Sequence, residues 1–474
     1  MPRSYLAAPL LVAALVGPAA AQPADPPALP AVASVPAPAP AVSPTAAFDD
    51  ALDQLLGRPG GLTSADVGAR AARTSPSAER KDAETVAARE RVREIQRSIM
   101  PIVSAGASFT RLSTIDPPML GPGVTLPQFF NQWHLGADAA LPLTELLVRL
   151  PVARDAAKDG VVAAELGARA ARLAASADAQ VAYYEWIRAQ LQVAVTTRLV
   201  AQVQATLTQV TALADAQRAA RGDVLRIDAQ RSSVELALAR IEQLVTIREL
   251  QLRLAIGASD DEQLVIGEDI RQPLELPALP ATDQLVTDAR ARRLEAKALV
   301  AANHAIERAL AGSKVGALPR FDVFGQVAYD NPNQRVFPQT GDFKLTWAAG
   351  ARITWSLNSY LAVDPQVEQA RAQSKAIAAD QRALGLGIRA EVENARTAFD
   401  LADRTLASTV EGLAAAEEGY RVRQELLANQ RATAIELVDA ETALTQARFS
   451  AIDALIDRHI AWVRLRHAAG LDLP

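Results

Sequence analysis

Residues 343–357 read FKLTWAAGARITWSL, and apolar and polar side chains alternate along them. The odd positions carry aromatic, aliphatic or alanine side chains, whereas the even positions carry mostly polar side chains or glycine, among them Lys344 and Arg352. A period of two is typical of a β-strand with one apolar and one polar face. This stretch therefore predicts a strand, and the other segments of the chain are interpreted around it.

Three further segments alternate in the same way, at residues 103–110, 133–141 and 321–330. Each of the four segments has about the ten residues that a tilted strand needs to cross a bilayer. Twelve of the 21 aromatic residues fall within 101–145 and 318–360, so we expect two membrane β-hairpins in these regions. Aromatic girdles are expected at the membrane interfaces, formed by Trp133, Phe321, Phe343, Trp347 and Trp355.

A soluble sheet also alternates, but its apolar face has to pack against bulky side chains of a second layer. The segments beside these hairpins are rich in alanine, so we expect the apolar face to meet lipid. An open sheet edge is not tolerated in lipid, because its backbone groups find no partner there. Four strands are too few to close a barrel, so other copies of the chain must pair with the edges.

The number of copies stays open on geometry alone. Two copies would give a narrow barrel of eight strands, whereas three would give twelve strands and room for a lumen. In either barrel the polar positions would face inward. The predicted lumen-facing residues are Asp138, Lys344 and Arg352.

Long helices are predicted between and after the hairpins. Proline is absent from residues 152–272 and 366–473, and both stretches are rich in good helix formers. Apolar residues between 227 and 254 form two stripes at helical spacing, which predicts a helix packed against neighbours on two sides. A helix from Val152 to about Arg221 would be roughly 100 Å long. These helices must therefore form something elongated.

The chain also repeats itself at an offset of 213 or 214 residues. Residues 133–137 correspond to 347–351, and Gly257 corresponds to Gly470, each glycine closing a helical stretch. We therefore expect two copies of one unit. The expected boundaries are a signal peptide at 1–21, a Pro/Ala-rich linker and the start of a helical region at 22–64, a first repeat at 65–257 with its hairpin at about 101–145, a linker at 258–285, and a second repeat at 286–474 with its hairpin at about 318–360.

Composition excludes several classes of function. The chain has no cysteine, which rules out disulfides, thiol catalysis, zinc–thiolate sites and a lipid anchor on an N-terminal cysteine. Its net charge of −5 gives no support for nucleic-acid binding. The first residues, with Arg3 before a short apolar core and alanines at 19–21, predict a cleaved signal peptide.

No catalytic constellation is recognisable, so we expect no enzyme, no cofactor and no metal site. The sequence contains neither a Walker-type glycine loop nor a nucleophile elbow. The four histidines show no metal-ligand grouping. Two of them, His459 and His467, are expected to be solvated residues on a helix.

Several short motifs occur in a fixed order. Residues 292–295 read RRLE and are followed by LPRFD at 318–322, while helical segments read DVLR at 223–226 and AIELVDA at 434–440. With the doubled spacing and the signal peptide, this order resembles the TolC-like outer-membrane efflux protein family over about residues 65–474. The resemblance implies a mainly α fold with membrane β structure. Long antiparallel helices would form an α-barrel, and two hairpins per protomer would contribute to a shared transmembrane β-barrel.

The resemblance also implies partners and a location. It implies a homotrimer in the cell outer membrane with a large periplasmic part, working with a periplasmic adaptor (membrane fusion) protein and an inner-membrane transporter. Glu436 and Asp439 match the residues that constrict the channel entrance, and Asp223 and Arg226 match the helix-tip contact with the adaptor. The glycine usual at the family's helix tips is absent, and Gln217 and Gln430 stand near the expected places.

The predicted function is a passive exit duct for efflux or type I secretion. Drugs, metal ions and polypeptides are all cargo of ducts that this resemblance covers. The alternative is a periplasmic coiled-coil adaptor or scaffold in which the alternating segments form a soluble domain. Membrane fractionation separates the two, because the duct requires detergent whereas the scaffold is freely soluble.

Overall fold

The computed structural model describes residues 53–472 except 99, 115–118, 122, 123, 126, 275, 277, 315–317 and 430; it leaves out the side chains of 119–121, 124, 125, 357, 359–362 and 434. The predicted signal peptide and most of the predicted linker at 22–64 lie outside the described residues. The described residues all belong to one unit, Thr45–Pro474.

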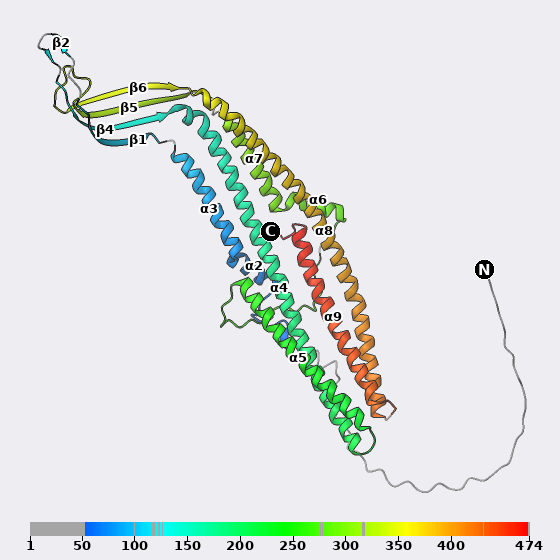
Figure 1. The fold of residues 1–474 in the computed structure, drawn as a ribbon. Coiled ribbons are helices and arrows are strands. Elements are labelled where there is room, and N and C mark those ends of the chain that lie inside the picture. Colours follow the sequence, from blue (N-terminus) through cyan, green and yellow to red (C-terminus); the bar gives the residue numbers. More distant parts are fainter. Residues whose placement is uncertain are drawn as a thin grey trace, which may run out of the picture. The chain divides into compact units, whose positions relative to one another are not determined.

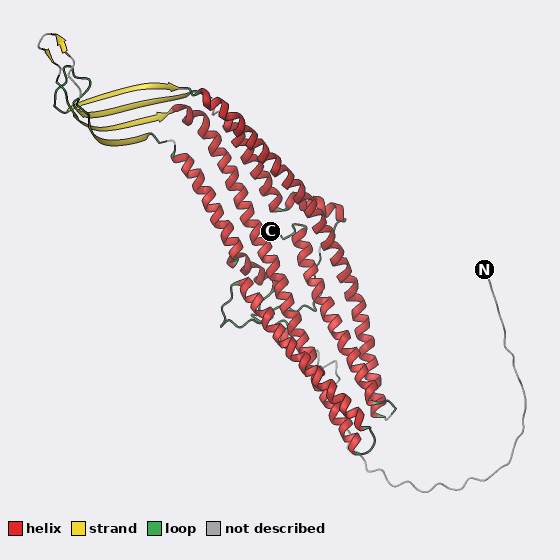
Figure 2. Ribbon diagram, viewed as in Figure 1, coloured by secondary structure: helices red, strands yellow, loops and turns green. Residues whose placement is uncertain are grey.

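Two very long helices dominate the described chain (Figure 2). Helix α4 spans Leu150–Asp215 and α8 spans Leu357–Ala428. At about 1.5 Å per residue, each is roughly 100 Å long. The proline-free stretches predicted both helices, although α8 begins before residue 366 and contains Pro365. The other helices are α2 (Ser64–Thr74), α3 (Pro76–Arg97), α5 (Arg221–Ile256), α6 (Thr282–Arg292), α7 (Leu294–Lys314) and α9 (Ala434–Ala468), and a π-helical turn, η1 (Glu145–Arg149), leads into α4.

The helices lie side by side, and the strands continue from one end of them (Figure 1). Helix α4 packs against α3, α5, α7 and α9, whereas α8 packs against α6, α7 and α9. Helices α5 and α9 both stop at a glycine in the left-handed region, with φ of 62° at Gly257 and 64° at Gly470. These are the two glycines that the repeat pattern marked as helix ends, and a glycine reaches this conformation without steric cost.

A four-stranded antiparallel sheet is formed by the four alternating segments, as predicted. Its strand order is β1-β4-β5-β6, so the second hairpin extends the first through the pairing of β4 with β5. A short two-stranded ribbon, β2 with β3, lies in the connection between β1 and β4. The strands are β1 (Ile102–Arg111), β2 (Met119–Gly121), β3 (Val124–Thr125), β4 (Asn131–Pro142), β5 (Arg320–Asn331) and β6 (Lys344–Thr354).

The main hydrophobic core lies midway along the helices. Its largest buried side chains, Tyr183 and Trp186 on α4, pack with residues of α9 and with Ile266 and Ile270 from the segment after α5. That segment runs beside the chain before α2 in a parallel bridge, where a Cβ on Gly61 would lie only 2.5 Å from the backbone. The region between the two predicted repeats, 258–285, therefore contributes buried residues to the core.

Candidate functional site

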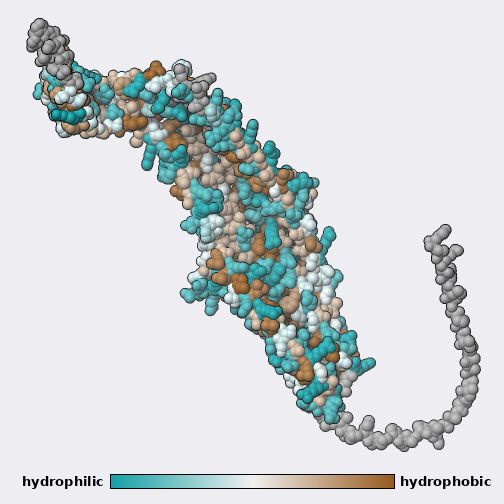
Figure 3. All heavy atoms as spheres, viewed as in Figure 1, coloured by the Kyte–Doolittle hydropathy of each residue, from teal (hydrophilic) through white to brown (hydrophobic). Residues whose placement is uncertain are grey.

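One face of the four-stranded sheet is apolar across all four strands. The register pairs odd-numbered residues with odd-numbered residues, so the odd positions of every strand share this face. Its large side chains are exposed, with Val103 at 72%, Leu345 at 68% and Trp347 at 73%. Figure 3 shows tan and brown residues over the middle of the strand region. Exposed apolar surface of this kind marks a contact with a membrane or a partner.

The aromatic residues predicted at the membrane interfaces all occupy odd positions. Trp133 and Phe343 lie at the loop end of the strands, Phe321 and Trp355 lie at the helix end, and Trp347 lies inside β6. All five are exposed. Four of them therefore mark two levels separated by the length of a strand, which is the arrangement that interfacial girdles require. Their contact with a membrane interface stays a prediction.

The opposite face of the sheet is polar. Asp138 accepts a hydrogen bond of 2.7 Å from the hydroxyl of Ser104 on the neighbouring strand. The guanidinium of Arg352 lies over the ring of Phe324, 4.9 Å from its centroid. The three residues predicted to face a lumen, Asp138, Arg352 and Lys344, all occupy even positions and share this face.

Both edges of the sheet are open in a single chain. β1 forms one edge and β6 the other, and neither pairs with a further strand of the described residues. Such edges present unpaired backbone N–H and C=O groups. Because the sheet also exposes an apolar face, it requires strands from another molecule wherever water is excluded.

The first helix tip joins α4 to α5. Gln217 has φ of 59°, and the amides of Gln217 and Arg218 close the end of α4 on the carbonyls of Ala214 and Leu213. This is a Schellman motif, in which glycine is the usual residue at the left-handed position. Glutamine there costs about 1 kcal/mol more than glycine. Gln217 therefore occupies the left-handed position at which glycine is most common. Gln430, the corresponding residue of the second tip, lies outside the described residues.

The predicted adaptor-contact residues sit just beyond this first tip. Helix α5 begins at Arg221, so Asp223 lies in its first turn, where a carboxylate complements the helix dipole. Asp223 is half-buried and Arg226 is exposed.

The second helix tip joins α8 to α9, and the two residues predicted at the channel entrance differ there. Glu436 belongs to a capping box: its carboxylate accepts from the amide of Thr433 at 3.1 Å, and Arg423 approaches it within 3.7 Å. Asp439, one turn further along, is exposed and takes part in no ion pair among the described residues. Glu436 thus stabilises the start of α9, whereas the carboxylate of Asp439 forms no ion pair among the described residues.

A buried carboxyl group close to this tip was not predicted from the sequence. Glu441 on α9 is 2% exposed and lies between three helices. Its Oε1 accepts from the hydroxyl of Thr206 on α4 at 3.3 Å and of Tyr420 on α8 at 3.5 Å. Burial raises the pKa of Glu441 to about 7. A sequence signal exists, because Glu441 interrupts the apolar stripe of Leu437 and Leu444 at helical spacing.

Glu441 predicts a pH dependence of stability. Its folded-state pKa of about 7 lies above the ordinary value of 4.5, so the folded protein holds this proton more tightly than the unfolded chain. The contribution of Glu441 to stability is therefore fully present below about pH 4.5 and falls as the pH rises to about 7, by up to about 3 kcal/mol. We expect Glu441→Gln to remove this slope and to raise stability at pH 8 by about 1–3 kcal/mol.

The measurement is thermal unfolding of the detergent-solubilised protein between pH 5 and pH 8. The matched control is Glu411→Gln on the exposed face of α8, which should leave the slope intact. An unchanged slope in Glu441→Gln would contradict the assignment.

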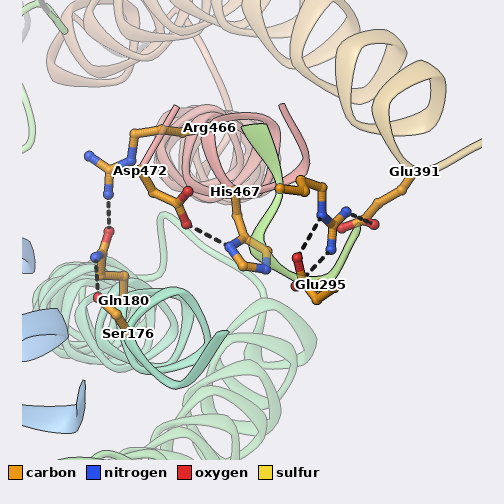
Figure 4. A network of polar contacts seen from close by, with 8 residues as sticks. Ser176, Gln180, Glu295, Glu391, Arg466, His467 and Asp472 are labelled. Carbon is orange, nitrogen blue, oxygen red and sulfur yellow. Dashed lines mark hydrogen bonds and ion pairs between the residues drawn. The ribbon is translucent and has the colours of Figure 1, made fainter. Parts of the chain in front are cut away.

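Two groups of polar contacts lie near the end of α9 (Figure 4). Arg293, at the break between α6 and α7, is 9% exposed; it bonds Glu295 at 3.2 Å and also pairs with Glu391 of α8. On α9, Arg466 donates to the side-chain carbonyl of Gln180 on α4 at 2.7 Å. The contacts of Arg293 with Glu295 and Glu391 give a physical role to the RRLE motif at 292–295.

The expectation of two solvated histidines on α9 was wrong. His459 is 3% exposed, and its Nε2 lies 3.1 Å from the carbonyl of Ile270; burial lowers its pKa. His467 is largely buried beside Asp472, whose hydrogen bond of 2.7 Å raises the pKa of the imidazole. Both rings face the packed middle of the molecule, because the segments after α5 and after α9 fold over that side of the helix.

Neither a metal cluster nor a membrane-spanning helix is found in the described part of the chain. No three His, Asp or Glu side chains there are grouped so that they would hold a metal ion. None of the described helices combines the length and the apolar character needed to cross a bilayer.

Comparison with known proteins points to one group of channels. A model of the outer membrane efflux protein family matches residues 285–471. No curated protein sequence matches the chain. Similar solved structures include the outer-membrane channel OprN (18% identity, 89% of this chain and 91% of that chain, TM-score 0.69), the open state of the Neisseria gonorrhoeae MtrE outer membrane channel (18%, 86% and 88%, 0.70) and the Campylobacter jejuni CmeC outer membrane channel (13%, 90% and 86%, 0.70).

Proposed function

We propose that the chain, whose residues 285–471 match the model of the outer membrane efflux protein family, is a TolC-like channel protein and one protomer of a homotrimeric exit duct. Each chain would contribute four strands to a twelve-stranded barrel in the outer membrane, and its helices would continue the duct into the periplasm. The duct is passive and serves efflux or type I secretion. A periplasmic adaptor and an inner-membrane transporter supply cargo and energy.

The observation that carries this proposal is the sheet with one apolar face, one polar face and two open edges. Its apolar side chains are exposed rather than packed beneath the chain's own helices, which is what a lipid-facing surface requires. Open edges in lipid need strands from neighbouring copies. The scaffold alternative would require a second layer over this face, so the sheet favours the duct.

The helices support the same assembly. The second apolar stripe predicted on α5 is exposed in the single chain, although a helix face of this kind normally packs against a neighbour. In the proposed trimer this stripe contacts the next protomer. Its exposed members are Leu236, Ile247, Leu250 and Leu254.

The proposal extends to the organisation of the chain. We propose that 65–257 and 286–474 are two copies of one unit, joined by 258–285. We also propose that Asp223 and Arg226 at the first helix tip contact the adaptor. Their position beside a surface turn supports this role.

The direct test has two readouts on the same sample. Protein extracted from outer membranes in detergent should have the mass of three protomers plus bound detergent by light scattering. The same sample should form ion-conducting channels in planar bilayers. A monomer that needs no detergent, or a trimer without conductance, would overturn the duct.

At the periplasmic mouth, we propose that Glu436 and Asp439 of three protomers form a ring of negative charge that favours cations. Asp439→Asn removes only a charge, because Asp439 is exposed outside the capping box. Glu436→Gln also removes only a charge, because glutamine replaces glutamate in a capping box. We expect the double amide variant to lower the cation-to-anion permeability ratio by about twofold or more.

The measurement is the reversal potential in planar bilayers under a salt gradient. Glu436→Ala serves as a comparison, since it also breaks the capping box and should destabilise α9 by about 1 kcal/mol. An unchanged permeability ratio in the double amide variant removes both residues from the entrance.

A further inference from the structure

The connection between β5 and β6 folds back over the polar face of the sheet. Its first four residues, 332–335, are called the strap here. Between the strap and the sheet lies a cavity of about 410 Å³. The cavity is lined by polar-face residues from all four strands, including Thr110, His134, Asp330 and Thr346. The strap therefore lies across the polar face and does not extend away from the strand ends.

Asn333 fixes the strap in this position. It is 2% exposed, although it belongs to a loop. Its side-chain amide donates to the carbonyl of Lys344 at 3.0 Å and to the hydroxyl of Thr346 at 3.4 Å, and its side-chain oxygen accepts from the amide of Arg335 at 3.0 Å. A buried, fully hydrogen-bonded polar side chain specifies one local arrangement.

A second attachment lies two residues further on. The guanidinium of Arg335 donates to the backbone carbonyl of Trp347 on β6 at 2.7 Å. Phe337, by contrast, is 80% exposed and does not line the cavity. The connection is thus held against the sheet through its first residues.

The strap lies at the end of the strands away from the helices. It follows the last residue of β5, opposite the start of β6, whereas the helices follow the other end of the strands. If the polar face lines the lumen, as the proposed function holds, three straps lie inside the outer mouth of the barrel. We propose that the strap narrows the exit of the duct without closing it and that Asn333 holds the strap in this position.

Single-channel conductance of the full-length protein in planar bilayers tests this. Asn333→Ala releases the strap, and we expect conductance to rise by about twofold or more because the narrowest part of a pore dominates its resistance. Phe337→Ala in the same connection should leave conductance within its wild-type range. Equal conductance of wild type, Asn333→Ala and a variant lacking residues 333–335 would overturn the proposal that the strap constricts the exit.

A second measurement stands if Asn333→Ala fails to assemble. The chain has no cysteine, so Arg335→Cys introduces a single thiol per protomer while Asn333 is retained. A bulky, charged methanethiosulfonate reagent should then reduce the current through Arg335→Cys channels and leave Phe337→Cys channels unaffected. Equal responses of the two variants would contradict the proposal that the strap lies in the path of the ions. Absence of conductance in the wild type would instead contradict the duct, so the two failures are distinguishable.

Discussion

Ala349→Arg is expected to prevent stable assembly in the outer membrane, whereas Ala348→Arg is expected to be tolerated. The two alanines are neighbours near the middle of β6, but Ala349 lies on the apolar face and Ala348 on the polar face. A charge on the lipid face at the centre of a membrane strand costs about 2–4 kcal/mol per protomer. On the polar face the same side chain remains in water, so its cost should stay below about 1 kcal/mol.

The measurement is the amount of heat-modifiable trimer in outer membranes, followed by the urea concentration at which it dissociates. The pair is matched in residue type, strand and depth, so the comparison reports only on which face is in lipid. Equal tolerance of both arginines would mean that the apolar face does not contact hydrocarbon.

Arg293→Ala is expected to destabilise the helical part strongly. Arg293 is 9% exposed and pairs with Glu295 and Glu391, so its removal leaves two carboxylates without their cation. Removing one partner of a buried ion pair is strongly destabilising. Both carboxylates here keep partial access to water, so we expect a loss of about 2–4 kcal/mol.

Arg292→Ala is the control, because Arg292 is adjacent and exposed, and its loss should change stability by no more than about 0.5 kcal/mol. The check is the thermal unfolding midpoint in detergent, together with proteolysis at the break between α6 and α7. Similar midpoints for the two variants would show that the network does not hold these helices together.

Much of the fold could be predicted from local sequence patterns. The alternation at 343–357 determines a strand and assigns each side chain to a face, because successive residues of a strand point to opposite sides. The proline-free stretches predicted α4 and α8, and Gly257 and Gly470 marked helix ends. The two faces of the sheet, and with them Asp138, Lys344 and Arg352, followed from the same period of two.

The roles of individual polar residues could not be predicted in this way. Glu436 was grouped with Asp439, although Thr433 and Glu436 carry the local signature of a capping box, which occupies only Glu436. Glu441 interrupts an apolar stripe, but its partner Thr206 lies 235 residues away in the chain, so no local pattern predicts their contact. His459 was expected in water and is covered by Ile270.

The sequence by itself therefore determined the strands, the long helices and the two faces of the sheet. These properties depend on backbone geometry and on the periodicity of adjacent residues. Only the tertiary structure decided which charged groups are buried, where the strap lies and which side of α9 faces the core. Burial and hydrogen bonding are set by residues far apart in the chain, which no local pattern brings together.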